Sequence, residues 1–165
     1  MSFADLIHGA LVQGDAAHLD VAAATRLGRA FGTALRRRTG GGARVVVVAR
    51  AGNGDELPMR DGLARGLVLC GHDVRDLGVA DQRQFAAALA RLGADGGALV
   101  LPAEGGERAV TFSLGVRPLV GEALAELALL ADGEDFAAGA GTLTLLDVHG
   151  AHDAAQRSDA ARGSG

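Results

Sequence analysis

The architecture of this chain follows from one short run, Arg44-Val45-Val46-Val47-Val48-Ala49. β-Branched side chains favour extended backbone, and the run lacks the polar alternation of a strand with one face in water. We therefore predict a strand over residues 44–49 that is buried on both faces. Such strands are typical of parallel sheets covered by helices on both sides.

Amphipathic helices are predicted before and after this strand in the sequence. Residues 19–38 carry apolar side chains at three- and four-residue spacing, and Asp20 is the candidate N-cap. Residues 58–70 have the same spacing, with Pro58 in the first turn. Along the sequence, the strand is thus preceded by one helix and followed by another, as in alternating α/β folds.

The alternation continues along the chain. We predict a partly polar strand at 72–77, a helix at 83–92 and a strand at 97–101. Strands and helices that alternate at this spacing indicate right-handed crossovers and a largely parallel sheet.

The last core strand is predicted at 109–114. The loop before it is too short for a parallel crossover, so this strand should pair antiparallel. A helix at 121–131 and a possible edge strand at 142–146 follow. We expect a three-layer α/β/α fold whose mixed, mostly parallel sheet has about four strands.

Length and charge narrow the possible functions. The 165 residues suit one domain, which we place at 1–148, followed by a small, polar tail at 149–165 that we expect to be disordered. The net charge of −4 and the absence of Trp and Tyr argue against nucleic-acid binding. The one basic run, Arg36-Arg37-Arg38, ends a predicted helix, where cations favour the helix dipole; a capping role is the favoured interpretation, and an anion or partner site is the alternative.

Targeting and redox signals are sparse. No apolar run approaches a membrane span and no signal peptide precedes the first helix, so we expect a cytoplasmic protein with no membrane contact. Cys70 is the single cysteine, which excludes an internal disulfide, and its apolar neighbours suggest a buried helix end.

Several polar clusters have alternative interpretations. The carboxylates of residues 53–56 and 104–107 could form a metal or acid/base site at the strand ends, but solvated loops are the favoured interpretation. Gly52-Asn53-Gly54 lacks the full dinucleotide fingerprint, and His149 and His152 fall in the predicted tail. We therefore expect neither a metal nor a cofactor.

Glycine-flanked phrases carry a resemblance to a known family. Leu27 to Gly32, the valine run, Gly62 to Leu67 and Gly71 to Gly78 occur in an order that resembles the first domain of the α-D-phosphohexomutases, the phosphomannomutase/phosphoglucomutase family. Residues 94–100, Phe112 and Pro118-Leu119 continue it, so that it spans about residues 3–148. The resemblance implies that family's domain I fold.

The family's phosphoserine loop is altered. Its Thr-Ala-Ser-His-Asn-Pro pattern is matched here by Leu101-Pro102-Ala103-Glu104-Gly105-Gly106. Ala103 has no oxygen to phosphorylate, so no covalent relay can operate at that position. Glu104 takes the place of the histidine and would repel a phosphorylated substrate.

Other family motifs are also reduced. The Gly-Arg-Asp-x-Arg pattern keeps only Arg50 and has Asn53 in place of the second arginine, Asp81-Gln82 replaces Thr-Pro, and residues 5–9 only faintly match the first signature. The resemblance implies that the family's magnesium loop belongs to a second domain and its sugar and phosphate recognition to a third and fourth, which this sequence does not contain. The candidate residual ligand positions are Arg50, Asn53, Asp81, Glu104, Gly105 and Gly106.

Three functions remain open. The first is a non-catalytic, phosphohexomutase-like protein that acts by protein contact or regulation in carbohydrate metabolism, with a full-length mutase or a second copy of itself as partner. The second is small-molecule binding by the altered loops. The third, a domain supplied in trans to a mutase, is disfavoured because Ala103 stands at the serine position. As an isolated chain it is not expected to be an enzyme.

Overall fold

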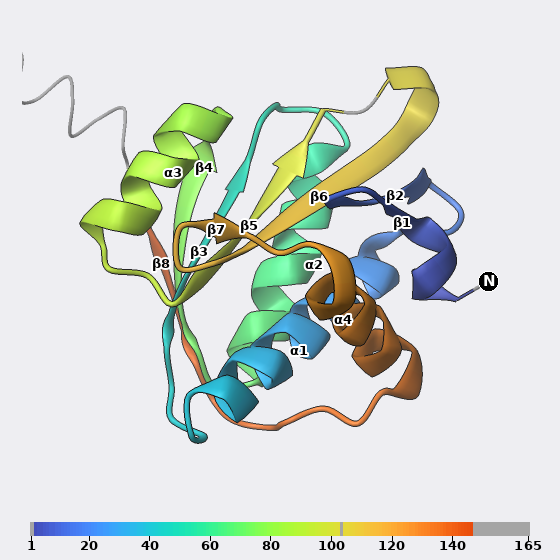
Figure 1. The fold of residues 1–165 in the computed structure, drawn as a ribbon. Helices are drawn as coiled ribbons and strands as arrows, with labels where there is room; N and C mark the ends of the chain where they lie inside the picture. Colours follow the sequence, from blue (N-terminus) through green and yellow to red (C-terminus); the bar gives the residue numbers. More distant parts are fainter. Residues whose placement is uncertain (1, 103, 147–165) are drawn as a thin grey trace, which may run out of the picture.

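The computed structural model describes residues 2–102 and 104–146 (Figure 1). The predicted tail at 149–165 and Ala103 lie outside the described residues. The helices, with 3-10 turns marked η, are η1 (Phe3–Leu6), α1 (Val21–Arg38), α2 (Glu56–Leu69), α3 (Gln82–Arg91), η2 (Glu104–Gly106) and α4 (Gly121–Gly133). The strands are β1 (Ile7–His8), β2 (Leu11–Asp15), β3 (Val45–Arg50), β4 (Asp73–Val79), β5 (Gly96–Leu101), β6 (Glu107–Leu114), β7 (Arg117–Pro118) and β8 (Thr142–Leu145).

The strands form one mixed sheet. Its order is β1-β2-β6-β5-β3-β4-β8, with β7 paired to β6. β3 pairs in parallel with β4 and β5, whereas β6 runs antiparallel to β5. β8 lies parallel to β4 at one edge. The mixed sheet, the antiparallel strand and the edge strand are confirmed.

The predicted number of about four strands is wrong, because the described part of the chain forms eight. The additional strands β1, β2 and β7 are short. β2 contains Gly14 and has no β-branched run, so its local sequence favours a strand only weakly. Its extended conformation depends on pairing with β6, where Val12 lies opposite Val110.

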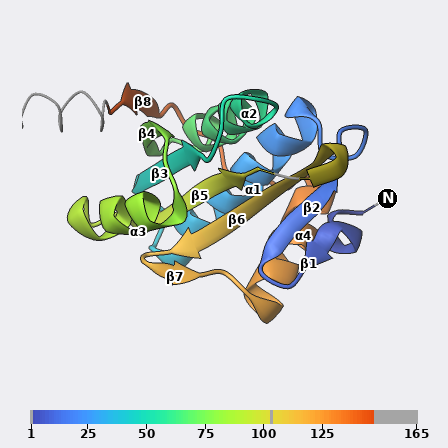
Figure 2. The same cartoon turned by 90° about the horizontal axis from the view of Figure 1, so that it is seen from above.

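Helices cover both faces of the sheet. α1, α2 and α4 pack on one face and α3 on the other (Figures 1 and 2). Val46 and Val48 belong to the larger core beneath α1, α2 and α4, while Val47 and Ala49 belong to the smaller core beneath α3. This explains why the valine run has no polar alternation, and it confirms the three layers.

Glycines set the distance between α1 and α2. A Cβ added to Gly28 would lie 2.4 Å from the Leu63 carbonyl oxygen, and one added to Gly66 would lie 2.3 Å from the Thr25 carbonyl oxygen. The two helix backbones can approach this closely only where side chains are absent. Both glycines belong to the phrases that carried the family resemblance.

The helix ends agree with the predicted signals. Asp20 caps α1 and accepts a hydrogen bond from the Ala23 amide at 2.8 Å. Cys70 follows α2 as its C-cap and is fully buried, as predicted. None of the helices in residues 2–102 and 104–146 is long and apolar enough to cross a membrane.

Candidate functional site

The loops after three parallel strands meet at one edge of the sheet. β3, β4 and β5 run in the same direction, so their carboxyl ends lie together (Figure 1). The Ala51 amide donates to the Val100 carbonyl at 2.8 Å, and the Ala80 amide donates to the Arg50 carbonyl at 2.9 Å. Ligand sites of open α/β sheets occur at such edges.

Arg50, the one arginine kept from the family pattern, closes its own loop. Its Nη1 donates to the Gly52 carbonyl at 2.7 Å and to Asn53 Oδ1 at 2.6 Å. Its Nε is buried and has no hydrogen-bond partner within the described residues. The structure therefore brings Arg50 and Asn53 together, but the Arg50 guanidinium bonds to residues of its own loop.

A cavity of about 310 Å³ opens beside this loop. Its acidic lining comes from Asp55, Glu56 and Glu107, and its one basic residue is Arg108. The Arg108 Nη1 donates to the Leu19 carbonyl at 3.0 Å, and its Nη2 lies 3.9 Å from Asp55 Oδ2. Glu107 accepts a hydrogen bond from Gln13. Three carboxylates thus face one arginine that is already engaged.

The N-terminus of α2 borders the same cavity. The free amides and dipole of a helix N-terminus attract anions. Here Glu56 occupies the first turn, and its Oε2 is buried without a hydrogen-bond partner in the part of the chain that the structure describes. Because the protein's own carboxylates occupy this position, the cavity favours an uncharged or cationic group over a phosphate.

The other predicted positions separate into two groups. Gly105 and Gly106 form the turn η2 with φ of 67° and 79°, a left-handed conformation that suits glycine, and Gly106 lines the cavity. Glu104 begins the same turn. Asp81 is not part of the cavity lining and caps α3 instead. Its Oδ1 accepts from the Gln84 amide at 2.7 Å, while its own amide donates to Gln84 Oε1 at 3.0 Å.

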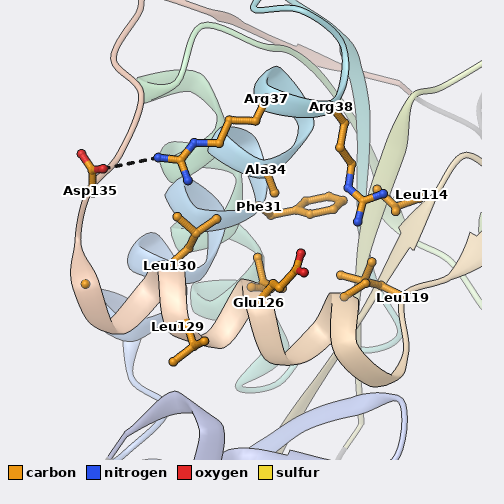
Figure 3. Close-up of a pocket in the computed structure, with 13 residues that line it drawn as sticks. Phe31, Ala34, Arg37, Arg38, Leu114, Leu119, Glu126, Leu129, Leu130 and Asp135 are labelled. Atoms are coloured by element: carbon orange, nitrogen blue, oxygen red, sulfur yellow. Dashed lines mark hydrogen bonds and ion pairs between the residues drawn. The ribbon is translucent and has the colours of Figure 1, made fainter.

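A second cavity was not foreseen from the sequence. It measures about 420 Å³ and lies between α1 and α4 (Figure 3). Phe31, Leu119 and Leu127 are its buried apolar residues, and Arg38 and Glu126 stand at its rim. The available signal was α4 itself, whose apolar residues extend beyond one helical face.

The buried histidine, His72, serves packing. His72 is fully buried; its Nε2 donates to the Gly32 carbonyl at 2.7 Å, and its Nδ1 accepts from the Arg44 amide at 3.2 Å. This pattern requires a neutral ring, and burial lowers the His72 pKa below its usual value. Within the described residues no group of three or more His, Cys, Asp or Glu side chains is arranged to hold a metal.

Comparison with known proteins identifies the fold. No family model and no curated protein matches the sequence. A solved structure of a phosphoglucomutase/phosphomannomutase family protein from Burkholderia thailandensis matches with a TM-score of 0.78 and 26% identity, covering 92% of this chain and 35% of that one. A protein described as a phosphomannomutase, from Thermus thermophilus, matches with a TM-score of 0.75 and 24% identity, covering 96% of this chain and 37% of that one. The chain therefore has the fold of one domain of phosphoglucomutase/phosphomannomutase family proteins and spans little more than a third of their length.

Proposed function

We propose that this chain is a non-catalytic, phosphohexomutase-like protein of carbohydrate metabolism that acts in the cytoplasm through protein contact. The main support is the charge of the cavity at the carboxyl edge, where Asp55, Glu56 and Glu107 outnumber Arg108. A hexose phosphate carries a doubly charged group, and carboxylates without compensating cations repel it.

The groups that could compensate are already engaged. Arg50 donates to its own loop, and Arg108 donates to the Leu19 carbonyl. The family resemblance also puts Ala103 at the position of the phosphoserine, which removes the nucleophile. A chain that lacks this nucleophile, and whose cavity arginine already donates to a backbone carbonyl, is better suited to binding a protein than to phosphoryl transfer.

The direct test mixes the purified chain with full-length phosphomannomutases and phosphoglucomutases from the same cell. We expect co-elution with one of them on gel filtration and a change in its turnover. Mutase turnover by the chain alone would overturn the non-catalytic assignment. Turnover of a mixture that is lost when the chain is omitted would support a domain supplied in trans. No effect on any mutase would remove the regulatory role.

A second candidate function has a specific observation in its favour. The buried Glu56 Oε2, unpaired within the described residues, lies beside the cavity and suits a cationic or hydrogen-bond-donating small molecule. Thermal shifts with sugars, sugar phosphates, nucleotides and divalent ions would test it, because a ligand that binds the folded state raises Tm. Glu56→Gln should abolish such a shift, whereas Glu122→Gln on the exposed start of α4 should preserve it.

A further inference from the structure

Helix α4 is apolar on more than its buried face. Leu124, Leu127 and Ala128 pack into the larger core. The outward side carries the exposed Ala125 and Leu129, and Leu129 is 66% exposed. The same side also carries the exposed Glu122 and Glu126. Leu129 is thus a large exposed apolar side chain beside carboxylates, a mixture of apolar and charged groups that is common at protein interfaces.

The cavity of about 420 Å³ between α1 and α4, called the groove below, is lined mostly by apolar side chains. Figure 3 shows Phe31 on the α1 side and Leu130 on the α4 side. Two of the groove's lining residues, Ala34 and Ala123, have small side chains, so the backbone of another helix can approach closely there. Apolar grooves between helices commonly receive the apolar face of an amphipathic helix.

The rim charges are self-complementary. Arg37 pairs with Asp135 at 3.4 Å, but Arg38 has no ion-pair partner among the described residues, and neither has Glu126. Figure 3 shows Arg38 rising from α1 and Glu126 from α4. α4 contains acidic residues and no Lys or Arg, whereas α1 ends in arginines. A second α4 would bring to the groove the charge that Arg38 lacks.

We propose that the groove receives α4 of a second copy of this chain, in a two-fold symmetric dimer. Each α4 then lies between α1 and α4 of the other copy, so Leu129 is buried and Glu126 faces the partner's Arg38. Two-fold symmetry makes every such contact occur twice. This inference rests on the proposed role in protein contact and names one partner for it.

Another exposed apolar surface provides the control. Leu143 and Leu145 on the edge strand β8 are also exposed, and an unpaired edge can join two sheets. α4 is favoured because its groove combines an apolar floor with rim charges of both signs that are unpaired within the described residues. The same substitution at Leu129 and at Leu145 separates the two surfaces, since both side chains are more than half exposed.

Sedimentation and light scattering of the 165-residue chain over a range of concentrations test the dimer. We expect a dimer whose Kd rises at least about tenfold in Leu129→Arg and is unchanged in Leu145→Arg. In thermal melts, both variants should unfold cooperatively, which would show that each monomer is still folded. A monomer at every concentration, or loss of the dimer only in Leu145→Arg, would overturn the proposal.

A charge exchange tests the geometry. Arg38→Glu and Glu126→Arg should each weaken the dimer by about tenfold, because each places like charges together at both ends of the interface. The double variant restores opposite charges and should recover most of the affinity. If both single variants dimerise with the Kd of the parent chain, Glu126 does not face Arg38 of the second copy. These dimer measurements contain no mutase, so they are independent of the test of the proposed function. If the chain is a monomer but co-elutes with a mutase in that other test, only the dimer is contradicted. If the chain is a dimer but affects no mutase, only the regulatory role is contradicted.

Discussion

The middle of the contact between α1 and α2 and the turn η2 at the carboxyl edge of the sheet differ in how closely other atoms pack around them. In the middle, Gly28 and Gly66 let α1 and α2 approach until no Cβ fits. At the edge, a Cβ added to Gly105 or Gly106 would meet nothing within 4 Å. The family resemblance is strong in the first region, and the chemical motifs are altered in the second. Folding requires the helix contact, whereas only catalysis requires particular side chains in the loops.

The largest effect should follow from filling the helix contact. In Gly66→Ala the new Cβ would lie 2.3 Å from the Thr25 carbonyl oxygen and 2.6 Å from the Arg29 nitrogen, so the helices must separate. We expect the free energy of unfolding to fall by about 3 kcal/mol or more, measured in urea. Gly133→Ala, where the added Cβ meets nothing, is the control. Equal stability of the two variants would show that the close approach is not required.

The next effect concerns pH and His72, which contacts α1 through the Gly32 carbonyl. Its pKa is lowered in the folded protein, so the unfolded chain binds more protons in acid. The stability that the neutral ring contributes is present above about pH 6.5 and is lost as the pH falls towards the lower folded pKa. Urea unfolding between pH 8 and pH 5 measures this loss before the carboxylates titrate.

His72→Gln should flatten that pH dependence, because it removes the buried imidazole. A parental slope in His72→Gln would assign the acid sensitivity to another group.

A smaller effect is expected at Asp81, on the loop after β4. Asp81→Ala removes one half of the capping box of α3 and should cost about 1 kcal/mol in unfolding free energy. Asp81→Asn keeps a capping oxygen and should lose less. If the aspartate instead serves a ligand, thermal stability would change little and the ligand-induced shift in Tm would disappear.

The smallest effect should follow from rebuilding the family motifs. In the triple variant Asn53→Arg, Ala103→Ser, Glu104→His, position 53 is exposed, so we expect that substitution to alter stability by no more than about 0.5 kcal/mol. We also expect no phosphomannomutase turnover, because the family's magnesium loop is absent from the sequence. Measurable turnover would show that these three side chains alone had abolished catalysis.

The sequence predicts much of the fold because its main signals are local. The valine run, the spacing of apolar residues in α1 and the cap at Asp20 depend on neighbouring residues, and each is confirmed. β2 is different, since only its pairing with β6 makes it a strand. The number of strands therefore could not be predicted from local propensity.

The candidate site was predictable in position but not in chemistry. Parallel strands bring Arg50 and Gly106 to one edge, as expected. The engagement of Arg50 with Asn53 depends on the path of the loop, which no periodicity encodes. Asp81 was an exception, because Asp81 and Gln84 have the spacing of a capping box. The groove between α1 and α4 required the tertiary structure.

Strand β3 contributes side chains to both cores, and this has a consequence for motion. Local opening of α3 exposes only the smaller core, so that layer can detach while the rest of the domain stays folded. The amides of β3 are held between β4 and β5 and remain protected during such an event. Hydrogen exchange should therefore proceed in α3 at a lower free energy than in β3, whose amides exchange only when the whole domain unfolds.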